Sequence, residues 1–444
     1  MRVNVPDYRR VADAIAADIA AGRLAPGDRL PPQRRFARMH RIANSTAARV
    51  YGELVRRGLA VGEVGRGTFI RAGQDGVEPA LAEPADARVD LELNFPVLPG
   101  QPARLAESLA GLLRADALGE ALRPAQVVGT PAAREAAIAT LSRAGWTAPP
   151  PLFAGSGRQA IAGAIAALVP VGERLGVEAI TYPVVKAVAD RLGVALVPLE
   201  TDGEGVSPAA IRAAAPLRAV YLQPTLHNPL GVTMPESRRA EVARVLRELD
   251  CYAIEDSIYA FLREEPAPLA AHAPERTVLI DSLSKRLAPG LTMGFAVPPA
   301  SLYERVAAAL RSGGWVASRF AMEAGTRWLA DGTAAEIARD KRKDAADRQR
   351  LLAERLAGFD VRADSGAYHC WWELPAPWRA ETFVAAAARH GMAITPAAAF
   401  TVGSGHAPNA VRLALSAPPR EILAHALDTL AALARSDADD TAEF

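Results

Sequence analysis

The 444-residue sequence contains little lysine, little cysteine and few aromatic side chains. Its two cysteines, Cys251 and Cys370, are too few for a disulfide framework and stand in no metal-ligand spacing, so we expect neither a disulfide-stapled fold nor a metal site. No apolar run approaches the roughly 20 residues of a membrane helix, and the N-terminus has no apolar secretory core. These absences predict a cytoplasmic protein with no membrane partner.

Lysine occurs only at Lys186, Lys285, Lys341 and Lys343, and the other 47 of the 51 basic residues are arginine. Arginine replaces lysine as a solvated charge, but its guanidinium does not form an imine at ordinary pH. Lys341 and Lys343 lie in the mixed-charge run ARDKRKDAADRQR, which indicates a solvated helix face. Lys186 opens a helical pattern, where we expect a surface charge.

Lys285 has different surroundings. It follows the aliphatic run TVLID and precedes a Pro-Gly breaker, so the pattern predicts a turn at the carboxyl end of a buried strand. Open α/β sheets bind their ligands at that edge. Lys285 is therefore the lysine for which nitrogen chemistry is the best explanation.

The net charge of +1 conceals an asymmetry along the chain. Residues 1–72 contain 14 arginines and 6 acidic residues, a net charge of +8, which leaves −7 for the remainder. Such segregation favours a polyanion as the partner of the N-terminal end.

Residues 1–72 show three helical patterns and a hairpin. The first pattern stops at Gly22, the second begins with prolines, and the third begins with the capping signals of NST and stops at Gly58. Only RIA separates the second from the third, which is helix-turn-helix spacing, and LAVGEVGRGTFI predicts a hairpin wing. Residues 73–90 lack periodicity and are rich in Gly, Pro, Ala and acids, so we expect a linker.

From about residue 91 onward, short aliphatic strands alternate with helical patterns, as in GVEAITYP, VALVPLE, AVYLQP and TVLIDSLS. This alternation predicts an α/β fold with a mainly parallel sheet. Residues from about 315 to 435 contain a long helical pattern followed by the strands YHCWWEL and NAVRLALS, which predicts a smaller α+β lobe.

These patterns carry a resemblance to known families. The basic module resembles the GntR-type winged helix, and residues 91–444 resemble fold-type I aminotransferases. The pair in one chain looks like the MocR family of pyridoxal-phosphate-dependent transcription regulators. The resemblance implies an N-terminal winged helix-turn-helix joined to an aminotransferase-like domain, pyridoxal 5'-phosphate as cofactor, a double-stranded DNA operator, a small amino-compound effector and a homodimer.

Pyridoxal phosphate needs an amine, a carboxylate for its ring nitrogen, donors for its phenolate oxygen, a stacking ring and a nest of N–H groups for its phosphate. The family motifs imply each group in turn: Lys285 of SLSK as the Schiff-base residue, Asp256 for the ring nitrogen, Tyr259 and Asn228 for the phenolate, Tyr182 for stacking, Ser156, Gly157 and Arg158 for the phosphate, with Ser282, Ser284 and Arg286 also in the cofactor-binding set. Arg412 of NAVRLALS is implied as the residue that grips an effector carboxylate.

Each of these residues also fits an ordinary structural role. Asp256 fits a helix cap, the two tyrosines fit core aromatics, Asn228 fits a turn before Pro229, and Arg412 fits a charge on a strand face. The joint order and spacing of the motifs favour the cofactor site over a set of independent accidents.

One position departs from the family pattern. MocR-type sequences usually carry an arginine for the cofactor phosphate seven residues after the lysine, and this chain has Thr292 there. A charge-assisted bond of that kind is worth roughly 1.5 to 3 kcal/mol. We expect Arg158 or Arg286 to supply the missing charge.

The third helical pattern, from about Asn44, is expected to enter the major groove of DNA. Ser45, Thr46 and Arg49 share one side of its start, Arg34 precedes it, and Arg66 lies in the wing. For Arg49 the alternative is a solvated charge.

Three functions are compatible with these patterns. The first is a regulator that senses an amino compound or a vitamin B6 vitamer through a Lys285 aldimine. The second is an active aminotransferase with an appended DNA-binding head, and it leaves the basic head unexplained. The third is a repressor whose aminotransferase-like domain only dimerises, and the retention of every core cofactor residue argues against it.

Overall fold

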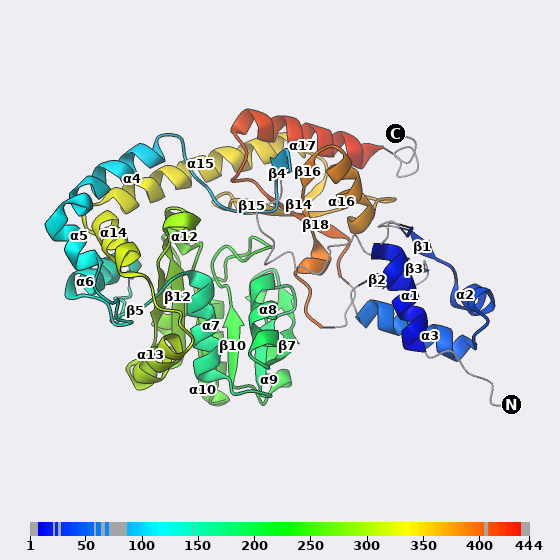
Figure 1. Cartoon of the computed structure of the whole chain (residues 1–444), viewed down its shortest axis with the longest axis horizontal. Helices are drawn as coiled ribbons and strands as arrows, with labels where there is room; N and C mark the ends of the chain where they lie inside the picture. Colours follow the sequence, from blue (N-terminus) through cyan, green and yellow to red (C-terminus); the bar gives the residue numbers. More distant parts are fainter. Residues whose placement is uncertain are drawn as a thin grey trace.

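The computed structural model describes residues 8–20, 23–24, 28–56, 59–63, 67–70, 87–143, 145–403 and 407–436. Most of the expected linker, residues 73–86, lies outside these ranges, as do the predicted helix stops at Gly22 and Gly58 and the wing residue Arg66. Figure 1 shows an N-terminal module beside a small lobe, with a large sheet-containing lobe on the far side of that small lobe.

The N-terminal module contains three helices and a three-stranded antiparallel sheet of order β1-β3-β2. Its elements are α1 (Tyr8–Ala20), β1 (Arg29–Leu30), α2 (Gln33–His40), α3 (Asn44–Arg56), β2 (Ala60–Glu63) and β3 (Gly67–Ile70). Phe36 of α2 meets Tyr51 of α3 edge to face, with 5.0 Å between ring centroids. Arg41 takes the left-handed conformation after α2, and three residues later α3 begins. The predicted helix-turn-helix with its hairpin is therefore confirmed for the described residues.

The large lobe is built on a seven-stranded sheet of order β5-β13-β12-β11-β10-β6-β7. Its strands are β5 (Leu152–Ala154), β6 (Arg174–Glu178), β7 (Ala195–Leu199), β10 (Ala219–Leu222), β11 (Tyr252–Asp256), β12 (Thr277–Ser282) and β13 (Gly294–Val297). Every neighbouring pair from β12 to β7 is parallel, whereas β13 runs antiparallel to both of its neighbours. The sheet is thus mainly parallel, as the alternating pattern predicts.

Helices cover both faces of this sheet because successive strand residues point to opposite sides. Tyr221 and Ile254 pack in one core with α7 (Gly157–Leu168), whereas Val220 and Ala253 pack in another with α10 (Glu236–Glu248). This arrangement leaves the carboxyl ends of the parallel strands as the edge at which a ligand site can form.

The small lobe holds an antiparallel sheet of order β14-β15-β18-β17, formed by β14 (Asp360–Ala363), β15 (His369–Glu373), β17 (Thr395–Pro396) and β18 (Ala410–Ala414). Helices α16 (Ala380–Arg389) and α17 (Arg420–Arg435) complete it around the buried side chains of Trp372, Trp378 and Phe383. Val89 and Asp90, the last residues of the expected linker range, form β4, which pairs in parallel with β16 (Met392–Ala393). The N-terminal end of the second domain is thus anchored in the C-terminal lobe.

The 23-residue helix α15 (Thr333–Arg355) connects the two lobes. Figure 1 shows it running from the side of α14 (Arg319–Ala330) to the small lobe. A solvated position was expected for both lysines of this helix, and that expectation is wrong for Lys341, which is fully buried, while Lys343 is exposed. Charge density alone does not reveal which face of a helix its neighbours cover.

The remaining elements of the described residues are α4 (Gln101–Leu109), η1 (Ala110–Leu113), α5 (Ala115–Ala121), α6 (Pro131–Leu141), α8 (Pro183–Arg191), β8 (Thr201–Asp202), β9 (Gly205–Val206), α9 (Pro208–Ala214), η2 (Ala260–Leu262), α11 (Leu269–His272), α12 (Leu283–Arg286), η3 (Pro289–Leu291), η4 (Ala300–Leu302), α13 (Tyr303–Ser312) and η5 (Ala397–Ala399). Within the ranges that the structure describes, no helix has the length and apolar character needed to cross a bilayer.

Candidate functional site

A cavity of about 470 Å³ opens at the carboxyl edge of the large sheet. The ends of β11 and β12 contribute Asp256 and Ser282, and Gln223 follows the end of β10. The cavity is lined by Leu93, Phe95, Ser156, Gly157, Arg158, Ile161, Tyr182, Gln223, Asn228, Asp256, Ile258, Tyr259, Ser282, Ser284, Lys285, Pro289 and Thr292. The fold thus brings ten residues of the implied cofactor-binding set together, and Arg286 is absent from the lining.

Lys285 lies in the four-residue helix α12, directly after β12. Its Nζ donates to the carbonyl oxygen of Asn94 at 2.5 Å and lies 3.5 Å from the centroid of the Phe95 ring. Burial lowers the pKa of Lys285 well below its ordinary value, and the charges of Arg158 and Arg412 lower it further. Both causes favour the neutral form of the side chain, and the neutral amine is the nucleophilic form of lysine.

Asp256 is a buried carboxylate without a cationic partner among the described residues. Its Oδ2 accepts from the Tyr221 hydroxyl at 2.5 Å and from Gln223 Nε2 at 3.0 Å, and its Oδ1 accepts from the backbone N–H of Ile258 at 3.1 Å. Burial raises the pKa of Asp256, although these hydrogen bonds oppose the rise. The carboxylate is therefore oriented by neutral donors and retains its demand for a positive charge.

Two buried amide side chains belong to this region: Asn228 lines the cavity, and Asn94 immediately precedes the lining residue Phe95. Asn94 Nδ2 donates to the Tyr259 hydroxyl at 3.0 Å, and burial raises the pKa of Tyr259. The Oδ1 atoms of Asn94 and Asn228 are buried and have no hydrogen-bond partner in the part of the chain that the structure describes. Buried polar atoms without partners are rare, and at a cavity wall they indicate a bound polar group.

The N-terminus of α7 closes one end of the cavity. The Ser156 side chain caps this helix by accepting from the backbone N–H of Gln159 at 3.3 Å. A Cβ on Gly157 would lie 3.2 Å from Ser282 Oγ, so the glycine permits the close approach of α7 to β12. Free N–H groups of a first helical turn attract an anion such as a phosphate.

Two polar contacts surround this helix start. The exposed Arg158 donates through Nε to the Tyr182 hydroxyl at 3.3 Å. The hydroxyl oxygens of Ser284 and Thr292 lie 2.5 Å apart. Thr292 therefore contributes a hydroxyl group to the cavity wall. Arg158 is the arginine nearest in sequence to the start of α7.

Two residues of the implied set lie away from the lining. Arg286 is buried, donates to Asp281 at 3.0 Å and is not among the lining residues, and its contribution of charge to the cavity stays a prediction. Arg412 is buried and donates to the Glu92 carbonyl at 2.6 Å and to Thr395 Oγ1 at 2.9 Å, while its Nε has no partner among the described residues.

Several residues at the cavity escape sequence reasoning. Asn94 and Phe95 reach Lys285 from 191 and 190 positions earlier in the chain. Tyr221 and Gln223 flank the end of β10, and the alternation YLQP was the only available signal for them. His227 is buried with its Nε2 3.1 Å from the Glu178 carboxylate.

The structure also places the residues expected to contact DNA. Arg34, Asn44, Ser45 and Arg49 are exposed, and Thr46 is half-buried. The Arg49 guanidinium lies 4.1 Å from the centroid of the Tyr8 ring of α1. Arg49 therefore contributes to packing between helices as well as to the positive surface.

His369, next to the site, supports a prediction on pH. Its Nε2 lies 2.9 Å from the carbonyl oxygen of His227, and burial lowers its pKa from 6.5 to about 3. Between these pH values His369 takes up a proton in the unfolded chain but not in the folded protein. The contribution of His369 to stability is therefore fully present above about pH 6.5 and is lost as the pH falls towards 3.

Between pH 6.5 and pH 5, we expect the free energy of unfolding of the cofactor-free wild type to fall by about 2 kcal/mol more than that of His369→Gln. The glutamine amide can donate to the same carbonyl and does not titrate. Urea unfolding of both proteins at pH 7 and pH 5 measures the difference. An identical pH dependence of the two would contradict the prediction.

Comparison with known proteins agrees with this geometry. Residues 103–430 match the family model described as aminotransferase class I and II, and residues 7–70 match that of bacterial regulatory proteins of the gntR family. A relative from Bacillus subtilis, the uncharacterized HTH-type transcriptional regulator YdeF, is 29% identical and covers 94% of this chain and 92% of its own length.

Two other relatives carry regulatory names. The probable rhizopine catabolism regulatory protein MocR of Rhizobium meliloti is 26% identical, covering 79% of this chain and 77% of the relative. The vitamin B6 salvage pathway transcriptional repressor PtsJ of Salmonella typhimurium is 25% identical, covering 89% of this chain and 91% of the relative.

Solved aminotransferases share the fold of the larger part of the chain. An archaeal alanine:glyoxylate aminotransferase matches with a TM-score of 0.71 and 21% identity, covering 79% of this chain and 91% of that chain. LysN, an α-aminoadipate aminotransferase from Thermus thermophilus complexed with N-(5'-phosphopyridoxyl)-L-leucine, matches with a TM-score of 0.69 and 22% identity, covering 78% and 92%. The predicted fold-type I architecture is confirmed.

Proposed function

This chain belongs to the aminotransferase class I and II family and carries a gntR-family module at its N-terminus; from that premise we propose that it is a DNA-binding transcription regulator that holds pyridoxal phosphate at Lys285 and senses an amino compound or a vitamin B6 vitamer there. One observation carries the proposal: the desolvated amine of Lys285 and the cation-free carboxylate of Asp256 line one cavity, in a chain that begins with a basic winged helix. Regulatory relatives of nearly the same length support it.

The residues of the cavity fit the cofactor. The unpartnered amide oxygen of Asn228 marks polar space at its wall, and the cavity of about 470 Å³ is within the range of small-molecule sites. The helix start at Gly157 suits a phosphate. Lys285 is the amine of the cavity lining.

Pyridoxal phosphate, when bound, supplies an aldehyde that reacts reversibly with primary amines and a ring that stabilises negative charge. Lys285 would hold it covalently, and Asp256 would keep a proton on the ring nitrogen. Tyr259 and Asn228 would donate to its phenolate oxygen, while Tyr182 would stack on the ring. Ser156, Gly157, Arg158, Ser282 and Ser284 would surround the phosphate.

An effector amine would compete with the Lys285 amine for the same reactive carbon. Arg412 is the proposed partner of an effector carboxylate, and its buried Nε, which lacks a partner among the described residues, supports that role. The effector would change DNA binding by the N-terminal module only if it binds two shapes of the protein with different affinities. The proposed assembly is a homodimer, and the proposed location is the cytoplasm.

DNA affinity with and without ligand tests the proposal. A duplex selected by the protein from random sequences would be titrated with the cofactor-free protein, with the cofactor-loaded protein and with the loaded protein plus candidate amines. We expect at least one amine or vitamer to change the affinity about 5- to 150-fold, the usual range of coupling between sites. Equal affinity under all conditions would contradict sensing.

An active aminotransferase is the second candidate, favoured by the match of residues 103–430 to the aminotransferase class I and II family. Lys285 could then move a proton between the substrate carbon and the cofactor, because its amine lies in the cavity and burial lowers its pKa. Sustained turnover of an amino acid with a keto acid, together with no measurable DNA binding, would favour this candidate over the regulator.

Arg158→Ala tests which residue supplies the positive charge that contacts the cofactor phosphate. Because Thr292 occupies the position of the usual arginine, we expect the exposed guanidinium of Arg158 to supply a charge-assisted bond. Its loss should weaken cofactor binding by about 10- to 150-fold, equivalent to roughly 1.5 to 3 kcal/mol. Equilibrium titration measures the change, and Arg350→Ala, at an exposed arginine of α15, is the control. Unchanged affinity would remove Arg158 from the account.

A further inference from the structure

The buried lysine of α15 has an unusual environment. Lys341 is fully buried, and no carboxylate of the described residues lies at ion-pair distance from its Nζ. Burial lowers its pKa to about 7, and the charge of Arg286 contributes. A buried lysine without an anionic partner costs stability, so its presence calls for a specific hydrogen-bonding task.

The two hydrogen-bond acceptors of Lys341 indicate what this task is. Lys341 Nζ donates to the carbonyl oxygen of Lys285 at 2.9 Å and to that of Leu287 at 2.6 Å. These carbonyls end the short helix α12, and the last carbonyls of a helix lack partners within it. Gln101 Nε2 also donates to the Leu287 carbonyl, at 3.0 Å. The turn that presents the Lys285 amine is therefore held by side chains of α15 and α4.

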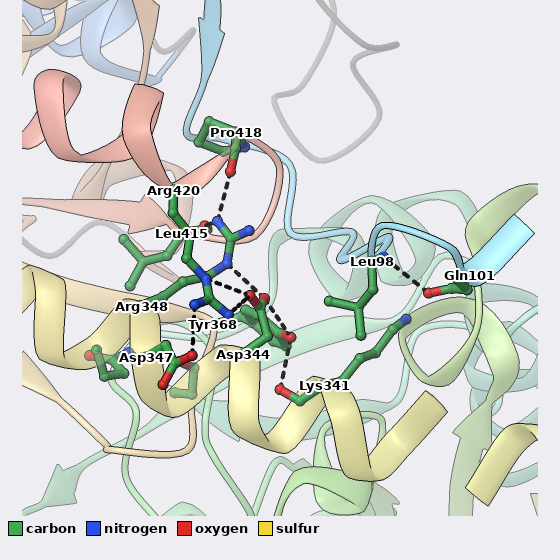
Figure 2. Close-up of polar contacts among 12 residues, drawn as sticks. Leu98, Gln101, Lys341, Asp344, Asp347, Arg348, Tyr368, Leu415, Pro418 and Arg420 are labelled. Carbon is green, nitrogen blue, oxygen red and sulfur yellow. Dashed lines mark hydrogen bonds and ion pairs between the residues drawn. The ribbon is translucent and has the colours of Figure 1, made fainter. Parts of the chain in front are cut away.

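The same residue is attached to the small lobe. The Tyr368 hydroxyl, just before β15, lies 2.9 Å from the carbonyl oxygen of Lys341 and 3.0 Å from Asp344 Oδ2. Asp344 also accepts from Arg348 Nε at 2.7 Å and from Arg420 Nη2 at 2.9 Å. Figure 2 shows this polar cluster along one face of α15, with Lys341 at the end nearer to Gln101.

The spacing along α15 explains why one helix reaches both places. Lys341, Asp344 and Arg348 follow each other at three and four residues, so they share one face. Arg348 Nη1 donates to the carbonyls of Leu415 and Pro418, which lead from β18 into α17. A continuous set of buried hydrogen bonds thus runs from the Lys285 turn to the connection between β18 and α17.

We propose that Lys341 is a positioning residue that holds the Lys285 turn in place and fastens it, through Tyr368 and Asp344, to the small lobe. This inference rests on the proposed function of Lys285 and adds to it a mechanical link by which a change at that turn reaches the C-terminal part of the protein. Lys341 itself does not line the cavity.

Lys341→Met tests the role, because methionine keeps most of the side-chain volume and removes both donated hydrogen bonds. Lys343→Met is the matched control, two residues away on the exposed face of the same helix. The rate of pyridoxal phosphate capture, followed by absorbance in stopped flow, should fall about 10- to 100-fold in Lys341→Met, since displacement of a reacting group by about 1 Å has effects of this size. The control should stay within about twofold of the wild type.

A second readout uses the cofactor-free protein. The charged groups that act on the Lys285 amine are Arg158, Arg412, Asp256 and Lys341, and Lys341 is among those that lower its pKa. Brief acetylation at a series of pH values, with mass spectrometry of the Lys285 peptide, reports that amine directly. In Lys341→Met the midpoint of the labelling profile should move to higher pH, because a positive charge that lowers the pKa of Lys285 is lost.

The outcomes separate this inference from the proposed function. If the wild type and Lys343→Met capture no cofactor, the proposed function fails, and the labelling profile still decides the role of Lys341. If they capture it and Lys341→Met matches them in both rate and profile, the inference is overturned. Should Lys341→Met not fold, Lys341→Gln, which can donate to one of the two carbonyls, decides by the same two measurements, and wild-type values would overturn the inference.

Discussion

Lys285→Ala is expected to abolish covalent retention of pyridoxal phosphate. The wild-type protein, incubated with the cofactor and reduced with borohydride, should carry it on the peptide that contains Lys285, and the variant should carry none. The physical reason is that alanine has no nitrogen, and the three other lysines of the chain do not line the cavity. Mass spectrometry of the digested protein, together with the visible spectrum before reduction, measures the result.

Lys343→Ala is the control for this experiment, because Lys343 is exposed on α15 and reports nonspecific modification of lysine. It should retain the cofactor as the wild type does. Cofactor found on Lys186, Lys341 or Lys343 of the wild type, and not on Lys285, would contradict Lys285 as the residue that holds the cofactor. Equal retention by Lys285→Ala and the wild type would have the same consequence.

DNA binding by the N-terminal module is expected to depend steeply on salt. Residues 1–72 carry a net charge of +8, and six or so phosphate contacts correspond to a loss of affinity of about a thousandfold between 50 and 200 mM salt. Release of condensed counterions from the duplex is the cause. Fluorescence anisotropy with the selected duplex across that salt range measures the slope.

Single arginine variants measure how much each arginine contributes to the salt dependence of DNA affinity. Arg34→Ala should lower the slope of log affinity against log salt by about one, as expected for the loss of one phosphate contact. Arg311→Ala, at an exposed arginine of α13 in the large lobe, should leave the slope unchanged. A salt-independent affinity, or an equal loss of slope in both variants, would contradict binding of the phosphate backbone through the head.

Much of the fold follows from local patterns in the sequence. Alternation of strands and helices predicts the parallel sheet because βαβ units have short connections and one handedness, and the strand before Lys285 predicts the edge at which its amine lies. The three-residue spacing between α2 and α3 identifies the helix-turn-helix for the same reason: neighbouring elements in the chain are neighbours in space.

The composition of the cavity wall depends on contacts that the chain order does not reveal. Asn94 and Phe95, which meet Lys285, lie in the segment after β4, and β4 pairs with β16 of the small lobe. Arg286 follows Lys285 in the sequence, yet its guanidinium turns to Asp281, since adjacent residues of a helix point in different directions.

Sequence alone thus determined the order of the modules and the type of sheet and singled out the lysine that the cavity contains, because scarcity, periodicity and motif spacing are local properties. Tertiary structure decided which charges are buried and what they bind. Lys341 and Lys343 stand in the same charged run, and only the packing of α15 against α12 and the small lobe sends one of them to two backbone carbonyls and leaves the other in solvent. Helical periodicity assigns residues to faces, whereas burial of a face depends on elements that are distant in the chain.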